Sequence, residues 1–195
     1  MVLRNERTRA TRERILNAAA QLFTRDGIRT TSVDTISDLA GLTKVTLYKH
    51  FRSKDELIAE VLEREENQWR TWFLERVNAL AQRPEDRLLA AFDVLAEWFQ
   101  TESFRGSPFI NTAMEVTDSN HPVHTVLAKH RAANRDFFRS NAEQAGFSDA
   151  KQIEESLILL FRGATVSALI EHRPDVAKHA KKAAEALLQS QATRV

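Results

Sequence analysis

The chain has 195 residues, of which 43% are hydrophobic and 28% charged, values typical of a globular protein rather than a disordered one. It contains no Cys, which excludes disulfides, thiolate metal sites and Cys nucleophiles. The formal net charge of +1 hides an asymmetry, because residues 1–54 hold 11 Lys and Arg against 5 Asp and Glu, whereas residues 55–195 hold 17 against 22. A basic segment followed by an acidic one predicts a polyanionic partner for the first segment alone.

The N-terminal stretch MVLRNERTRATRER is basic and lacks the apolar core of a signal peptide. The longest strictly apolar run, residues 157–161, is far shorter than a membrane span. We therefore expect a soluble cytoplasmic protein without a membrane partner. The basic stretch is expected to be either a solvated arm or one that reaches a phosphate or the minor groove, through Arg4, Arg7, Arg9, Arg12 and Arg14.

Helical periodicity runs through almost the whole chain, and no segment shows the sustained alternation of a strand. A first helix is expected over residues 8–25, with Gly27 just after its end. A short second helix over residues 33–40 has Ser32 as its N-cap, and Gly41 forms the turn that follows. The side chains of this second helix expected to face inward are Ile36, Leu39 and Ala40.

Thr43 is expected to cap a third helix over residues 44–50, which buries Leu47. Ser53 begins a fourth helix that reaches about residue 81, and Glu56 completes a capping box at its start. Further helices are expected over residues 84–101, 108–117, 122–145, 149–171 and 174–190. The sequence thus predicts an all-α fold of about nine helices.

The segment 30–54, TTSVDTISDLAGLTKVTLYKHFRSK, places two short helices on either side of a tight turn. This is the helix-turn-helix arrangement, in which the second helix lies in the major groove of DNA. Hydroxyl and basic side chains bind phosphates, and short side chains near the start of the second helix reach base edges. The candidate DNA-binding residues are Ser32, Thr43, Lys44, Val45, Thr46, Tyr48, Lys49, His50 and Lys54.

Some of these candidates have a purely structural alternative. Tyr48 fits a core position, His50 fits a stabiliser of the helix C-terminus, and Thr43 is a cap whether or not it touches DNA.

At these residues the sequence resembles the tetracycline-repressor (TetR) family of bacterial transcriptional regulators. The resemblance covers residues 14–61 and is carried by ILNAAAQLFTRDG, TTSVDTISDLAGLTKVTLYKHF and SKDEL. It implies that residues 43–50 form the recognition helix and that Lys54 binds phosphate. Three residues depart from the family pattern: Val45 stands where many relatives have Gly, Asp34 where many are basic, and Ser37 where Ala is usual. Val45 favours a methyl contact with thymine, and Asp34 would repel phosphate.

Most aromatic side chains follow residue 60, and on helices they form a core first of all. A cavity lined by such side chains is also the usual form of a small-molecule site, and the resemblance implies that this region binds an inducer of unknown identity. Glu115 either anchors the ligand or pairs with Arg162. The candidate ligand-binding residues are Trp69, Phe73, Trp98, Phe104, Phe109, Asn111, Met114, Glu115, Phe138 and Phe161.

The stretch 157–170 is apolar on nearly every side and contains small residues, so a helix here needs two packing partners. With residues 174–190, it predicts a two-fold dimer interface over 149–171 and 174–190, and the resemblance implies a four-helix contact. The alternative is the central helix of a monomer.

His121, His124 and His130 raise the question of a metal site, but no carboxylate or Cys stands at a firm ligand spacing. We expect no metal, no cofactor and no enzyme activity, because no catalytic constellation can be assembled. Two domains are expected: residues 1–54 bind DNA, and residues 55–195 bind ligand and dimerise.

The expected function is a repressor that binds a palindromic operator as a homodimer and is released by a small-molecule inducer. A helical enzyme with a basic tail and an interaction protein that retains the fold without binding DNA are the alternatives.

Overall fold

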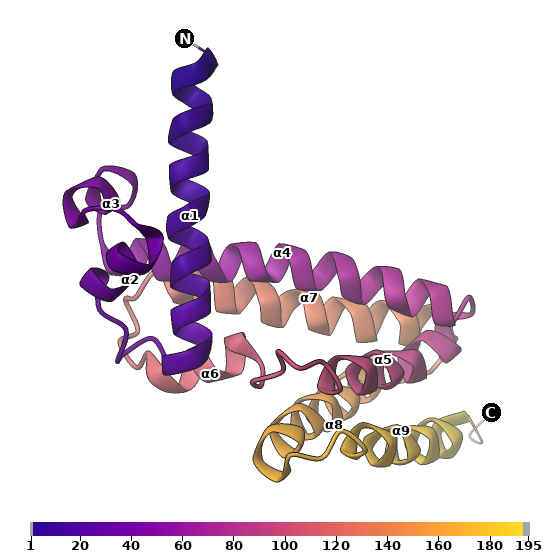
Figure 1. Cartoon of the computed structure of the whole chain (residues 1–195). Coiled ribbons are helices and arrows are strands. Elements are labelled where there is room, and N and C mark those ends of the chain that lie inside the picture. Colours follow the sequence, from indigo (N-terminus) through magenta and orange to yellow (C-terminus); the bar gives the residue numbers. More distant parts are fainter. Residues whose placement is uncertain (1, 193–195) are drawn as a thin grey trace. The chain divides into compact units, whose positions relative to one another are not determined.

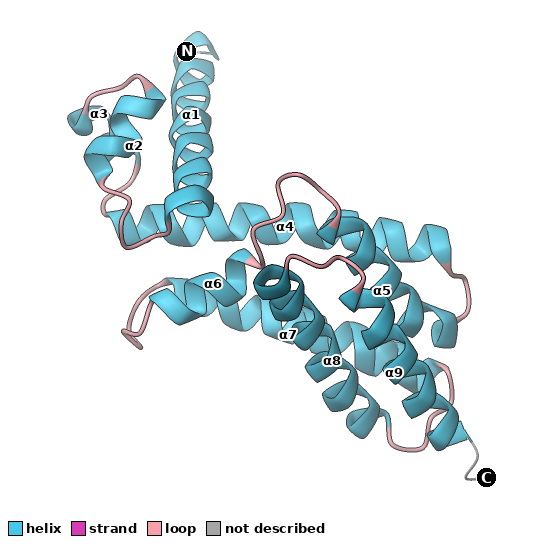
Figure 2. Ribbon diagram, turned by 60° about the horizontal axis from the view of Figure 1, so that its bottom comes forward, coloured by secondary structure: helices cyan, strands magenta, loops and turns pink. Residues whose placement is uncertain are grey.

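The computed structural model describes residues 2–192, with the side chains of residues 6–191. These residues form nine helices and no strand, so the predicted all-α fold is confirmed (Figures 1 and 2). The helices are α1 (Val2–Asp26), α2 (Val33–Ala40), α3 (Lys44–His50), α4 (Lys54–Leu80), α5 (Pro84–Phe99), α6 (Pro108–Glu115), α7 (Val123–Gln144), α8 (Ala150–Glu171) and α9 (Val176–Ala192).

The helix ends lie close to their predicted positions, except at the start of α1. This helix begins at Val2 rather than near residue 8, so the predicted start of the first helix is wrong, whereas contact between the basic stretch and DNA stays a prediction. The physical reason is composition: the stretch is rich in Arg and Glu, which are good helix formers, and contains neither Gly nor Pro. The side chain of Arg4 lies outside the described residues.

The predicted capping box at the start of α4 forms in part. The backbone N–H of Glu56 donates to Ser53 Oγ at 3.1 Å, as expected. The carboxylate of Glu56, however, accepts from the backbone N–H of Arg52 at 2.6 Å, one residue before the N-cap.

The chain divides into two compact units. The head unit comprises Met1–Asn67 and Pro108–Ala128, and the body unit comprises Gln68–Ser107 and Lys129–Val195. Helices α4 and α7 each contribute to both units. The head unit therefore includes residues 55–67 and 108–128, which were predicted to belong to the C-terminal domain.

The head unit has two apolar clusters. The first joins α1, α2, α3 and the start of α4, and its fully buried members include Ile15, Ile36, Leu47, Phe51 and Leu57. The second joins the loop after α1 to α4, α6 and the start of α7, through Ile28, Ile58, Leu62, Phe109, Val116, Val123, Val126 and Leu127. The corner between α6 and α7 is thus part of the same folded unit as the helix-turn-helix.

The body unit is built around aromatic side chains from α4, α5, α7 and α8. Phe73, Phe92 and Phe138 are almost fully buried, and Phe161 meets all three at ring-centroid distances of 5.6–6.0 Å in edge-to-face geometry. Helix α9 packs against α5 and α8. Within the described residues, no helix is both long and apolar enough to cross a membrane.

Candidate nucleic-acid interface

Helices α2 and α3 each begin with a hydroxyl cap, as predicted. Ser32 Oγ accepts from the backbone N–H of Thr35 at 3.0 Å, and Thr43 Oγ1 accepts from that of Thr46 at 3.2 Å. Between the helices, Gly41 has a φ of +62°, which glycine adopts without the steric cost of a side chain. These local features fix the turn of the helix-turn-helix.

The inward face of α2 differs from the prediction at one position. Ile36 and Ala40 are buried as expected, but Leu39 is 47% exposed. The prediction for Leu39 is wrong because, at 100° per residue, the buried face of this helix passes through Ser37 instead. Ser37 is buried, and its hydroxyl has no hydrogen-bond partner in the structure.

Two arginines of the basic N-terminal stretch fasten α1 to the rest of the head unit. Arg14 donates to the carbonyl oxygens of Ala40 at 2.5 Å and Gly41 at 3.3 Å, and so caps the C-terminal end of α2. Arg12 forms an ion pair with Glu60, and its guanidinium lies 4.6 Å from the ring centroid of Phe51. These two arginines brace the head unit, whereas Arg7 and Arg9 are exposed.

The outer face of α3 carries the candidate reading residues. Val45 is 66% exposed and Tyr48 is 44% exposed, so Tyr48 is not a core residue. Lys44 and Lys49 are also exposed, while Thr46 and His50 are half-buried. Leu47 and Phe51, on the opposite side, are fully buried and hold the helix against α1 and α4. A rigid helix therefore presents methyl, phenol and ammonium groups to solvent, which suits contacts with base edges and phosphates.

An ion pair that was not among the predictions from the sequence links the first turns of α2 and α3. Lys44 Nζ lies 3.0 Å from Asp34 Oδ1. The hydrogen bond to this carboxylate raises the pKa of Lys44. Asp34 thus meets a cation instead of standing as an isolated negative charge.

Lys54, the predicted phosphate ligand, is engaged within the head unit. Its ammonium donates to the backbone carbonyl of Ile28 at 2.6 Å. Partial burial lowers the pKa of Lys54. An ammonium has three donors, so contact between Lys54 and a phosphate stays a prediction.

Glu115 contacts the loop between α1 and α2, the loop that Lys54 contacts at Ile28. Its carboxylate accepts from the backbone N–H of Arg29 at 3.0 Å. It also lies against Gly27, where a Cβ atom would stand 3.3 Å from Oε2. Nearby, His121 Nε2 lies 3.2 Å from Asp55 Oδ1. Glu115 therefore ties the end of α6 to the loop that enters α2.

The ten candidate ligand-binding residues fall into both units. Trp69, Phe73, Trp98, Phe104, Phe138 and Phe161 lie in the body unit, and Phe109, Asn111, Met114 and Glu115 lie in the head unit. Those in the body unit form one contiguous aromatic cluster, in which Trp98 is 4.4 Å from Trp69 and 5.0 Å from Phe104 between ring centroids. Phe73, Phe138 and Phe161 are buried, whereas Trp69, Trp98 and Phe104 are half-buried. Met114 is 80% exposed.

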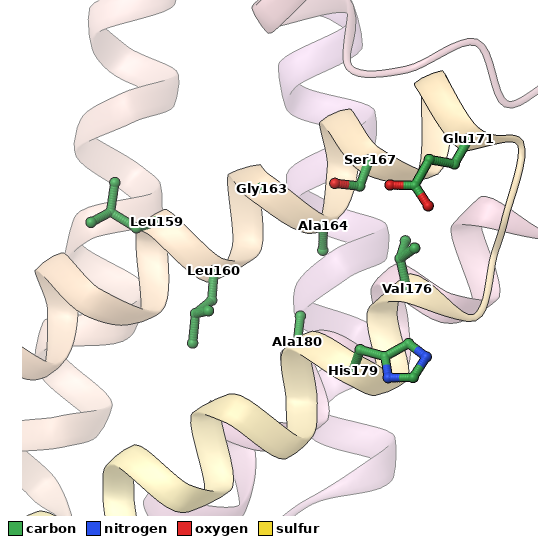
Figure 3. A pocket seen from close by; sticks show the side chains of 9 residues that line it. All are labelled: Leu159, Leu160, Gly163, Ala164, Ser167, Glu171, Val176, His179 and Ala180. Carbon is green, nitrogen blue, oxygen red and sulfur yellow. The ribbon is translucent and has the colours of Figure 1, made fainter.

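An open groove of about 270 Å³ runs between α8 and α9 (Figure 3). Small residues such as Gly163, Ala164 and Ala180 line it, together with Leu159 and Leu160. Apolar side chains on this side of α8 are strongly exposed, Leu159 at 71% and Ile170 at 70%. This is the part of the chain where the sequence predicts a dimer interface.

No group of three or more His, Cys, Asp or Glu side chains is placed to hold a metal ion in the described part of the chain. His121 instead uses Nδ1 to accept from the backbone N–H of Val123 at 3.2 Å, which caps the start of α7.

A capped helix-turn-helix with a polar, partly basic outer face, joined to a helical body, defines a DNA-binding regulator of the helix-turn-helix class. Residues 15–61 match the family model described as "Bacterial regulatory proteins, tetR family", and residues 84–184 match "Tetracyclin repressor-like, C-terminal domain". The chain belongs to the TetR family of transcriptional regulators, so the resemblance seen in the sequence is confirmed.

Some known relatives match over nearly the full length. The transcriptional regulator YjdC of Escherichia coli is 21% identical over 178 residues, which cover 91% of this chain and 93% of YjdC. Among solved structures, a putative TetR-type regulator (sav143) from Streptomyces avermitilis is 31% identical, with a TM-score of 0.75 and coverage of 90% of this chain and 98% of that one. SCO4454 from Streptomyces coelicolor is 26% identical, with a TM-score of 0.85 and coverage of 93% and 95%.

Proposed function

We propose that this transcriptional regulator is a repressor that binds a palindromic operator as a homodimer and is released from it by a small-molecule inducer. The observation that carries the proposal is the exposed face of α3, where Val45 and Tyr48 stand clear of the core beside Lys44 and Lys49. The proposed DNA contacts are Ser32, Thr43, Lys44, Val45, Thr46, Tyr48, Lys49, His50 and Lys54. Residues 1–54 are the proposed DNA-binding domain.

Repression is supported by a relative that is itself a repressor. The transcriptional repressor KstR2 of Rhodococcus jostii is 43% identical over 51 residues, which cover 26% of this chain. The match covers about a quarter of either chain, 26% of this one and 25% of KstR2, so it supports repression as the mode of action but not the identity of the operator.

The dimer contact is proposed at α8 and α9, within the proposed ligand-binding and dimerisation domain of residues 55–195. Leu159, Val166 and Ile170 expose apolar surface along one side of α8, and the adjoining groove is lined by small residues that permit close helix approach. A second copy related by a two-fold axis would cover this surface with the same surface of its own. Two copies of α3 would then meet successive major grooves, with half-sites about 34–36 Å apart.

The inducer site is proposed among the aromatic side chains. Of the ten candidates, Trp69, Trp98 and Phe104 keep part of their ring surface outside the packed core, which supports an apolar or aromatic inducer. Such a ligand shifts binding only if it has a different affinity for the DNA-competent and the released state.

The test is equilibrium binding to two duplexes of roughly 30 base pairs, one selected by the protein from a randomised pool and one of scrambled sequence. A repressor of this kind should prefer the selected duplex by at least about 10³-fold. Its affinity should fall steeply as salt rises, because phosphate contacts release counterions. Equal affinity for the two duplexes would refute the proposal. A thermal-shift screen, with quenching of Trp69 and Trp98 fluorescence as a second readout, then searches for the inducer.

A further inference from the structure

The ion pair between Asp34 and Lys44 stands among the proposed base-reading residues. Lys44 Nζ is 3.0 Å from Asp34 Oδ1 and 3.1 Å from Oδ2, so one ammonium meets both oxygens of the carboxylate. The two side chains nevertheless keep 50% and 67% of their surface exposed. Lys44 is the first residue of α3 and directly precedes Val45. The pair is therefore accessible to a duplex that binds along α3.

A carboxylate at this position opposes binding to DNA of any sequence, because duplex DNA is a polyanion. A phosphate that approached Lys44 in this position would lie close to the carboxylate of Asp34, and the two negative charges would repel each other. If Lys44 left Asp34 for the phosphate, the carboxylate would be left unpaired beside the DNA backbone. If Lys44 stays on Asp34, the pair has no net charge and gives little sequence-independent attraction. The ammonium still has protons to donate, and the pair fixes their direction.

The neighbouring hydroxyls are already engaged with each other. Thr43 Oγ1 and Thr46 Oγ1 are 2.9 Å apart, and Thr43 also caps the helix. Lys44 is thus the donor at the start of α3 whose position is set by a second side chain from another helix. An ammonium held in this way suits the paired acceptors N7 and O6 on the major-groove edge of guanine.

We infer that Asp34 is a specificity-determining residue, which holds Lys44 toward base edges and suppresses its attraction to phosphates. The inference rests on the proposed binding of DNA through α3. Beyond that binding, we expect the discrimination between bases at one base-pair position of each half-site to depend on Asp34, a residue of α2.

The experiment compares two variants, Asp34→Asn and Asp38→Asn. Asp38→Asn is the control, because it removes the same charge from the same helix without touching the carboxylate that binds Lys44. Affinity is measured for the selected and the scrambled duplex, and the ratio of the two is the readout. Asp34→Asn should lower this ratio by about fivefold or more, mainly through tighter binding to the scrambled duplex. The salt slope for the scrambled duplex should steepen by up to about 0.9, because Lys44 becomes free to contact a phosphate.

Two further measurements separate positioning from charge alone. In a Lys44→Met background, Asp34→Asn should shift the affinity for both duplexes equally and leave the ratio unchanged. Selected duplexes with single base-pair changes should reveal one position per half-site where Asp34→Asn abolishes discrimination. Circular dichroism checks that each variant remains folded.

The possible failures are distinguishable. If the wild-type protein does not prefer the selected duplex, the proposed reading of DNA by α3 is refuted, and the inference falls with it. If the wild-type protein prefers that duplex but Asp34→Asn and Asp38→Asn change both affinities alike, only the inference is overturned, because Asp34 then acts merely as a charge.

Discussion

Replacing Gly27 with Ala should destabilise the head unit for two separate reasons. Gly27 has a φ of +86°, a conformation that costs an L-residue about 1–2 kcal/mol. A Cβ atom there would also lie 3.3 Å and 3.4 Å from the two carboxylate oxygens of Glu115. Glu115 would have to move, and its hydrogen bond to the backbone of Arg29 would weaken. Because that bond is exposed to solvent, it is worth only about 1 kcal/mol. We therefore expect Gly27→Ala to lower the free energy of unfolding of the head unit by about 2–3 kcal/mol in total.

Gly146 provides a matched control in the body unit. Its φ is +83°, but a Cβ atom would meet nothing within 4 Å. Gly146→Ala should therefore lower the free energy of unfolding only by the cost of the left-handed backbone conformation, about 1–2 kcal/mol. The same reduced cost is expected for Gly27→Ala in a Glu115→Ala background, where the crowding carboxylate is absent.

The assay is native-state amide hydrogen exchange, which reports the free energy of opening in each unit separately. Tryptophan fluorescence is not sufficient, since Trp69, Trp72 and Trp98 all lie in the body unit. If Gly27→Ala lowers the opening free energy of the head unit equally in the wild-type and Glu115→Ala backgrounds, Glu115 does not crowd position 27 and the proposed cause is refuted.

Three other substitutions test separate parts of the structure. Ser37→Ala should stabilise the head unit by about 1 kcal/mol, because it removes a buried hydroxyl that has no partner; a lower opening free energy in hydrogen exchange would contradict this. Leu159→Glu should give a monomer in sedimentation, since it places a charge on the proposed dimer surface; a dimer of unchanged affinity would place the contact elsewhere. Tyr48→Ala should weaken binding to the selected duplex by about fivefold or more without loss of helicity, whereas unchanged affinity would remove Tyr48 from the interface.

Local chemistry made the helix-turn-helix predictable from the sequence. Ser32 and Thr43 are hydroxyl caps placed one residue before an apolar helical pattern, and Gly41 occupies a left-handed turn. Each of these signals acts over a few residues, so no knowledge of the tertiary structure was needed. The error at Leu39 arose because a helix of eight residues has too few positions to fix its buried face from periodicity alone.

The contacts that complete the site could not be read from local patterns. Asp34 and Lys44 are ten residues apart on different helices, and Glu115 is 86 residues from its partner Arg29. Such pairs depend on how helices pack, which local sequence patterns do not specify. For the same reason the sequence could not reveal that Glu115 closes a loop of the head unit, although it singled out the residue.

The candidate ligand residues illustrate a similar limit. Aromatic composition correctly indicated a core, and Phe73, Phe138 and Phe161 are buried in it. Composition does not distinguish these residues from Met114, which is 80% exposed. Nor does it reveal that the ten candidates belong to two folded units.

The most direct test of the central claim is a hydroxyl-radical footprint of the purified protein on its selected duplex. Two copies of α3 related by a two-fold axis predict two symmetric protected tracts whose centres lie about 10–10.5 base pairs, or roughly 34–36 Å, apart. Protection of both tracts should be lost together when Tyr48 and Lys44 are replaced. A single unsymmetric tract, or protection that survives these substitutions, would contradict a paired reading of DNA by α3.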